Sequence, residues 1–212
     1  MPAAGVADAP RSRGGASATT PAVLILACGA LAREILASIA PARLPHIRLQ
    51  CLPASLHNRP DRIAPAVRAA LAEYRERYDK IFVAYADCGT GGELDRVLAD
   101  AGVERLPGAH CYAFFTGVDR FAAAEDADLR SFFLTDFLAR QFDTLVWEGL
   151  GLDRHPDLRD AYFGQYERVV YLAQTEDAAL TDAARAAARR LGLTFERRFV
   201  GYGDLAPALA AL

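Results

Sequence analysis

The chain has 212 residues, of which 52% are hydrophobic and 24% are charged, and its formal net charge is -3 at pH 7. This length is sufficient for one sizeable hydrophobic core. The charge balance provides no basic footprint for nucleic acid, and no apolar run is long enough to cross a bilayer. We therefore expect neither a nucleic-acid partner nor a membrane association.

The first twenty residues differ from the rest of the chain in composition. They are rich in Ala, Gly, Ser and Pro, and they lack the apolar centre of a secretory signal. We predict a disordered leader over 1–20, with organellar targeting as an alternative because of Arg11 and Arg13. The remainder, 21–212, is predicted to be a single α/β domain. Four cysteines without an export signal are typical of a reducing compartment, so the expected location is cytoplasmic.

The first half alternates between strand and helix patterns. Residues 22–27 are a continuous apolar run, and apolar residues then recur at helical spacing from Leu31 to Ile39. Further strands are predicted over 46–52, 81–85 and 103–106, and further helices over 63–74 and 94–101. This alternation predicts a mainly parallel sheet with helices on both faces.

The second half begins less regularly and then returns to the same pattern. Residues 136–148 are predicted to form a helix capped by Thr135, followed by a strand over 169–173, a helix ending near Leu191 and a strand over 194–200. Two arrangements fit. One is a single sheet with a helical excursion, and the other is two similar lobes, 21–120 and 121–212, around a cleft.

Three cysteines and one histidine follow successive predicted strands. Cys28, Cys88 and Cys111 follow the first, third and fourth strands, and His57 follows the second. The carboxyl ends of parallel strands meet at one edge of a sheet, and helix N-termini there lower thiol pKa values. These four residues are therefore candidate ligands of a zinc ion or an iron-sulfur cluster.

Each of these residues also has a plainer interpretation. A free cysteine often behaves as a small buried apolar residue, which is our prediction for Cys51 within its alternating strand. Cys28, Cys88 and Cys111 could equally be core residues, and His57 could simply cap a turn. Cys88 could also act alone as a nucleophile.

The segment after the third strand offers further candidates. Gly89, Thr90, Gly91 and Gly92 are candidate cofactor-binding residues, because glycines let backbone N–H groups approach a phosphate, although a tight turn also explains them. Asp87 and Glu34 are candidate catalytic residues. Asp87 could instead cap the next helix or raise the pKa of Cys88, and Glu34 could be a metal ligand, a general base or a solvated charge.

Seven short motifs in order resemble the bacterial and archaeal domain-of-unknown-function family 1638. They are CGAL at 28–31, CLPA at 51–54, LHNRP at 56–60, DCGTGG at 87–92, HCY at 110–112, FFLTDF at 132–137 and GLDRHP at 151–156. The resemblance covers roughly residues 22–204. It implies an association with one-carbon metabolism, since members often lie beside genes for corrinoid proteins, trimethylamine-type methyltransferases and their reductive activators.

The residues and the resemblance together predict a metal- or metallocofactor-binding protein that serves corrinoid-linked methyl transfer. Its expected partners are a small molecule or a corrinoid or methyltransferase protein, with corrinoid contact at the site. Two alternatives are a non-catalytic cofactor-carrying or docking module for a methyltransferase system, and a small-molecule enzyme with a single nucleophilic cysteine. Whether the protein is an enzyme stays open at this stage.

Overall fold

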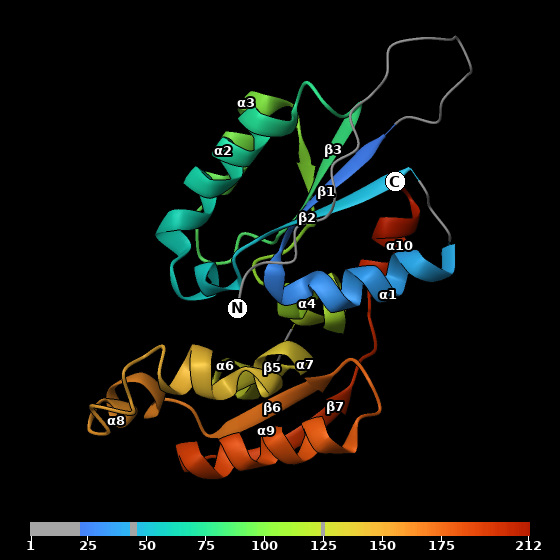
Figure 1. The fold of residues 1–212 in the computed structure, drawn as a ribbon. Coiled ribbons are helices and arrows are strands. Elements are labelled where there is room, and N and C mark those ends of the chain that lie inside the picture. Colours follow the sequence, from blue (N-terminus) through green and yellow to red (C-terminus); the bar gives the residue numbers. More distant parts are fainter. Residues whose placement is uncertain (1–21, 43–45, 124–125) are drawn as a thin grey trace, which may run out of the picture.

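The computed structural model describes residues 22–42, 46–123 and 126–212. The leader predicted over 1–20 lies outside these residues. The described chain forms two all-parallel sheets with helices packed on them, which confirms the predicted α/β class. Figure 1 shows the two sheets in separate lobes, one above the other. None of the described helices is long and apolar enough to cross a membrane.

The first sheet has the strand order β2-β1-β3-β4. Its strands are β1 (Val23–Cys28), β2 (Ile47–Leu52), β3 (Lys80–Ala84) and the short β4 (Glu104–Arg105). In the register of the central strand β1, Val23 is paired with both Ile47 and Lys80. Because β1 is covered on both faces, its residues are apolar without alternation.

Helices cover both faces of this sheet (Figure 1). The helices α1 (Ala32–Ala42) and α10 (Leu205–Ala210) lie on one face, and α2 (Ile63–Tyr74) and α3 (Glu93–Ala101) on the other. Successive strand residues face opposite sides, so Ile25 packs in the core with α1 and α10, while Leu26 packs in the core with α2 and α3. Three 3₁₀ turns complete the connections: η1 (Gly29–Leu31), η2 (Ala54–Asn58) and η3 (Pro60–Arg62).

Three short helices lead from the first sheet to the second. They are α4 (Cys111–Thr116), α5 (Val118–Ala122) and α6 (Asp126–Leu129). The second sheet has the order β5-β6-β7, with β5 (Ser131–Thr135), β6 (Arg168–Ala173) and β7 (Thr194–Phe199). Around it lie α7 (Asp136–Arg140), α8 (Leu158–Phe163) and α9 (Ala178–Leu191), and the core under α9 includes Tyr171 and Leu138.

The structure differs from the sequence prediction in two places. Residues 131–135 form a strand that the sequence pattern does not predict, because its apolar run is only three residues long (132–134) and no turn separates the strand from the helix that follows. The helix predicted over 136–148 ends at Arg140 and is followed by a π-helix, η4 (Phe142–Trp147). The predicted cap is confirmed, since the Thr135 hydroxyl accepts a hydrogen bond of 3.3 Å from the backbone N–H of Leu138.

Candidate functional site

Three thiols lie at the carboxyl end of the first sheet. Cys28 is the last residue of β1, Cys88 lies in the loop after β3, and Cys111 begins α4. All three are partly buried, and all three pack against the core that includes Phe114. The structure therefore brings these thiols, which are far apart in the sequence, into one neighbourhood.

The thiols in this neighbourhood are protonated at neutral pH. Burial raises the pKa of Cys88 to about 11, and the nearby Cys28 adds to the effect. Burial also raises the pKa of Cys28, and it raises that of Cys111 well above the ordinary value, with Cys88 and Cys28 contributing. Because the thiolate is the nucleophilic form of cysteine, these residues are weak nucleophiles in the protein as it stands.

Cys51 lies beside Cys28 of this group, and His57 lies near His110, the residue before Cys111. His57, in η2, has its pKa lowered by burial and by the neighbouring His110, so its imidazole is neutral. Cys51, in β2, packs against the core of the first lobe, as its position in an alternating strand predicts. Burial and then Cys28 raise the pKa of Cys51 to about 11.

The four predicted metal ligands have suitable chemistry but are not placed to hold a metal ion together. Thiols and imidazoles suit zinc and other soft metals, and a cation would stabilise the thiolates. However, no group of three or more His, Cys, Asp or Glu side chains in the described part of the chain is placed to hold a metal ion. A site formed by Cys28, His57, Cys88 and Cys111 therefore stays a prediction, and it requires the side chains to move.

The glycine-rich loop is organised around Asp87. The Asp87 carboxylate accepts hydrogen bonds from the Thr90 hydroxyl at 2.6 Å, the Gly92 N–H at 2.9 Å and the Gly91 N–H at 3.2 Å. Although burial opposes it, these bonds lower the pKa of Asp87. Of the donors predicted to cradle a phosphate, those of Thr90, Gly91 and Gly92 thus already have Asp87 as a partner within the loop.

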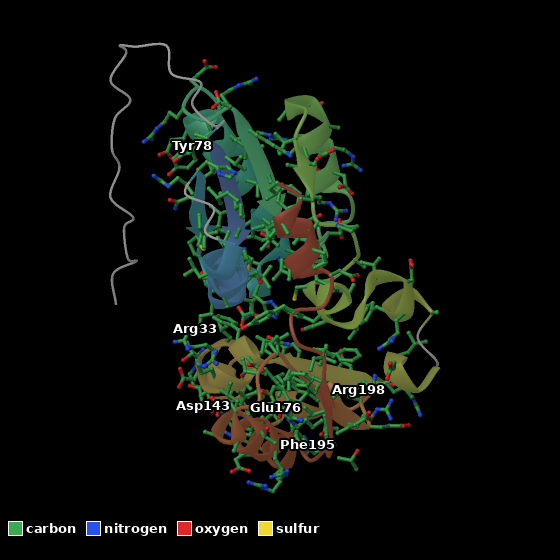
Figure 2. All side chains as sticks on the ribbon, turned by 90° about the vertical axis from the view of Figure 1, so that its right-hand side faces the viewer. Arg33, Tyr78, Asp143, Glu176, Phe195 and Arg198 are labelled. Atoms are coloured by element: carbon green, nitrogen blue, oxygen red, sulfur yellow. The ribbon has the colours of Figure 1, made fainter. Side chains whose placement is uncertain are left out.

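A cavity of about 650 Å³ lies between the two lobes. Its walls come from the segments that follow β1, β5, β6 and β7, so the carboxyl ends of both sheets face it. The charged and polar side chains that line it include Arg33, Glu34, Asp136, Arg140, Thr175 and Tyr202. Figure 2 shows Arg33 at the junction of the lobes and Glu176, another lining residue, on the second lobe. We call this cavity the interlobe cleft.

Asp136 organises the second-lobe wall of the interlobe cleft. Its side chain is 1% exposed and accepts hydrogen bonds from the Tyr171 hydroxyl at 2.6 Å, the Gln174 N–H at 3.0 Å and the Thr175 hydroxyl at 2.5 Å. The Asp136 N–H in turn donates to the Gln174 side chain at 2.6 Å. These bonds tie the start of α7 to the loop after β6, and they give the buried carboxylate the partners that its charge requires.

Two other groups of the cleft are not satisfied in this way. Glu34 is 5% exposed, and its Oε2 atom has no hydrogen-bond partner among the described residues. One terminal nitrogen of Arg140 is likewise buried without a partner there. Burial raises the pKa of Glu34, and the Asp136 charge adds to the rise. We refer to these two as the unpartnered atoms of the interlobe cleft.

The sequence prediction included Glu34 and missed the second-lobe residues of the cleft. Asp136 and Gln174 each directly follow a strand of the second sheet, which is the signal that could have found them. That signal was hidden for Asp136 because β5 was not predicted. Tyr202 follows the last strand, and its pKa is raised by burial and then by Glu34 and Asp136, which shows how closely these groups lie.

The fold and the cleft define a two-lobed α/β protein with a polar cavity at the carboxyl ends of both parallel sheets. Residues 51–209 match the family model described as protein of unknown function (DUF1638), so the chain belongs to this family. The motifs at 51–54, 56–60 and 87–92 lie within the matched range. Neither the curated proteins nor the solved structures contain a match to the chain.

Proposed function

We propose that the protein binds a small polar molecule in the interlobe cleft, with groups of both lobes contacting it. The observation that carries the proposal is the unpartnered Oε2 of the buried Glu34 in the wall of the cleft. Leaving a buried polar atom without a hydrogen bond costs about 1–3 kcal/mol, so such atoms are rare unless something binds them. A bound molecule would supply the missing partner.

The position and size of the cleft support this function. In parallel α/β folds, ligands bind outside the carboxyl ends of the strands, and here two sheets present those ends to one cavity. Its volume of about 650 Å³ is in the range of small-molecule sites. Because α1 and α7 supply opposite walls, a ligand there would also hold the lobes together.

Glu34 is the group in the cleft best suited to proton exchange. Its pKa is raised by burial, so both its protonated and its ionised form are accessible closer to neutral pH than for an exposed glutamate. The role of general base that the sequence suggests for Glu34 is part of this proposal. It applies if the bound molecule is also transformed.

A thermal-unfolding screen tests the binding function. The full chain is mixed separately with amino acids, organic acids, sugar phosphates and nucleosides at millimolar concentration. We expect one class to raise the unfolding temperature of the wild type, with the rise lost in Glu34→Gln and in Arg140→Gln. Glu148→Gln, at an exposed position, is the matched control and should keep the rise. A screen in which no class stabilises the wild type would contradict the proposal.

A second candidate function is binding of a thiophilic metal or metallocofactor by Cys28, Cys88 and Cys111. It is favoured by one observation, namely that the three thiols gather at one end of the sheet, where Cys28 adds to the raised pKa of Cys88, and Cys88 and Cys28 add to that of Cys111. A metal cation would deprotonate them and remove that mutual repulsion. On this proposal His57 is the fourth ligand, and the metal would supply Lewis-acid chemistry if it is zinc or redox chemistry if it is an iron-sulfur cluster.

Cobalt(II) titration tests the metal candidate without an activity assay. Anaerobic protein that binds cobalt through several thiolates should develop strong sulfur-to-metal absorption in the near ultraviolet. That absorption should fall in Cys28→Ser, Cys88→Ser and Cys111→Ser, while Cys51→Ser keeps it. Wild-type protein that develops no such absorption would exclude the thiolate site, and the link to corrinoid-dependent methyl transfer would then depend on the family resemblance alone.

A further inference from the structure

The two unpartnered atoms of the interlobe cleft have opposite hydrogen-bonding character. Glu34 Oε2 belongs to a carboxyl group and, when ionised, accepts a hydrogen bond, whereas the Arg140 guanidinium nitrogen can only donate one. They come from different lobes, since Glu34 lies on α1 and Arg140 at the end of α7. As neither atom has a partner in the described chain, the two do not satisfy each other.

The remaining acidic side chains of the cleft are already engaged within the protein. Asp136 accepts hydrogen bonds from three groups of the second lobe. Glu176 accepts one from Arg197 at 2.7 Å, and Asp177 accepts the N–H groups of Ala179 and Leu180 at the start of α9. The acidic wall is therefore not a free cation-binding cluster, and the lining residues that hold an unpartnered buried atom for a ligand are Glu34 and Arg140.

From this pairing we infer that the ligand is a small zwitterion of the amino-acid class, whose ammonium group binds Glu34 and whose carboxylate binds Arg140 across the two lobes. The inference rests on the proposed function of the cleft. A dianion such as a phosphate ester would place negative charge beside Glu34 and Asp136, and a simple amine would leave the Arg140 nitrogen unpaired. A zwitterion satisfies both atoms and adds no net charge to the site.

The other features of the cleft agree with this ligand. Arg33 lies at the junction of the lobes (Figure 2) and lines the cleft, where it adds a second positive charge to that of Arg140. An ammonium group beside Glu34 would favour its ionised form, so binding should release a proton from the fraction of Glu34 that is protonated before binding. The volume of about 650 Å³ accommodates an amino acid with a sizeable side chain.

Isothermal titration calorimetry of the full chain tests the inference. The probes are the proteinogenic L-amino acids and, for each that binds, two analogues, namely the amine without the carboxylate and the acid without the amine. We expect at least one amino acid to bind and each of its analogues to bind about tenfold or more weakly. In buffers of different ionisation enthalpy, the observed heat should report proton release on binding.

Two variants assign the two ends of the ligand. Glu34→Gln should weaken the binding of the amino acid by about tenfold or more and leave the binding of the amine-free acid unchanged. Arg140→Gln should also weaken the binding of the amino acid by about tenfold or more, but it should leave the binding of the carboxylate-free amine unchanged. Circular dichroism confirms that each variant is folded. If organic acids or sugar phosphates bind the cleft and no amino acid does, the inference is wrong while the proposed binding function stands. If no probe of any class binds, both fail.

Discussion

Glu34 and Arg140 reach the interlobe cleft from different lobes, and each carries a buried atom that no described residue satisfies. Asp136, which lines the same cleft and lies on α7 with Arg140, accepts hydrogen bonds from three donors. Asp136 therefore helps to build the cleft, whereas Glu34 and Arg140 keep atoms that can bind a ligand. For the same reason, we expect substitutions of Glu34 and of Asp136 to change the stability of the protein in opposite directions.

Glu34 should destabilise the folded protein at neutral pH. Its pKa is raised in the folded state, so folding favours the protonated form, and the free energy of unfolding falls as pH rises from the ordinary glutamate value to the raised one. Below the ordinary value the carboxyl is protonated in both states and the penalty vanishes. Glu34→Gln removes the titrating charge and should therefore be more stable than wild type at neutral pH.

Urea unfolding at several pH values checks this prediction. The advantage of Glu34→Gln over wild type should shrink as pH is lowered towards the ordinary glutamate pKa. Glu148→Gln, at an exposed position, should track wild type at every pH. A Glu34→Gln protein that is less stable than wild type at neutral pH would show that the carboxylate has a partner that stabilises its charge.

The Asp136 carboxylate should stabilise the folded protein, in contrast to that of Glu34, because it accepts hydrogen bonds from three donors. Asp136→Ala removes the acceptor of three hydrogen bonds and leaves the Tyr171 hydroxyl and the Gln174 N–H buried without it. We expect a loss of about 3 kcal/mol or more in the free energy of unfolding. Asp143→Ala removes only an exposed ion pair with Arg190 and should change stability by less than about 1 kcal/mol. Equal effects of the two substitutions would contradict the network described for the cleft.

The sequence predicted the first lobe better than the second for a physical reason. The strands β1 and β3 are largely apolar runs followed by glycine-containing turns, so their ends, and hence the placement of Cys28, Glu34 and Cys88, could be predicted from the pattern. The second-lobe wall depends on β5, whose last residue is directly followed by α7, and no turn marks that boundary. Asp136 was therefore read as a helix residue and not as a strand-end residue.

The hydrophobic pattern of the sequence predicts strands and helices, but it does not predict where individual side chains lie. Strand order explains why Cys28, Cys88 and Cys111 share one edge of the sheet, but ligand geometry depends on rotamers and on burial, which are tertiary properties. The same limit applies to the glycine-rich loop. The glycines predict N–H groups that approach an anion, and the anion that they meet is the carboxylate of Asp87.

Cys88 should react slowly with alkylating reagents at neutral pH. Its pKa is about 11, so the thiolate fraction at pH 7 is about 100-fold lower than for an ordinary thiol. The rate of reaction with iodoacetamide should rise about tenfold per pH unit without a plateau up to the highest pH at which the fold persists. Peptide mass spectrometry measures this rate for each cysteine, with circular dichroism as the control for folding. A plateau near pH 7 would instead identify Cys88 as an activated nucleophile.

The backbone at Cys88 gives a prediction that does not depend on its chemistry. Cys88 has φ of +50°, a left-handed conformation that costs a residue with a side chain about 1 kcal/mol relative to glycine. Cys88→Gly and Cys88→Ala both remove the sulfur, and only glycine relieves the backbone. We therefore expect the glycine variant to be more stable than the alanine variant by about 1 kcal/mol in urea unfolding.

Cys28 provides the matched control, because its φ of -63° is ordinary for any residue. At this position Cys28→Gly should be less stable than Cys28→Ala by about 0.5–1 kcal/mol, since glycine loses more conformational freedom on folding. The order of the two substitutions should thus reverse between two cysteines of the same neighbourhood. If alanine is preferred at both positions, the loop at Cys88 relaxes when the thiol is removed. In that case the side chain of Cys88, and not the sequence of the surrounding loop, holds the left-handed turn in place.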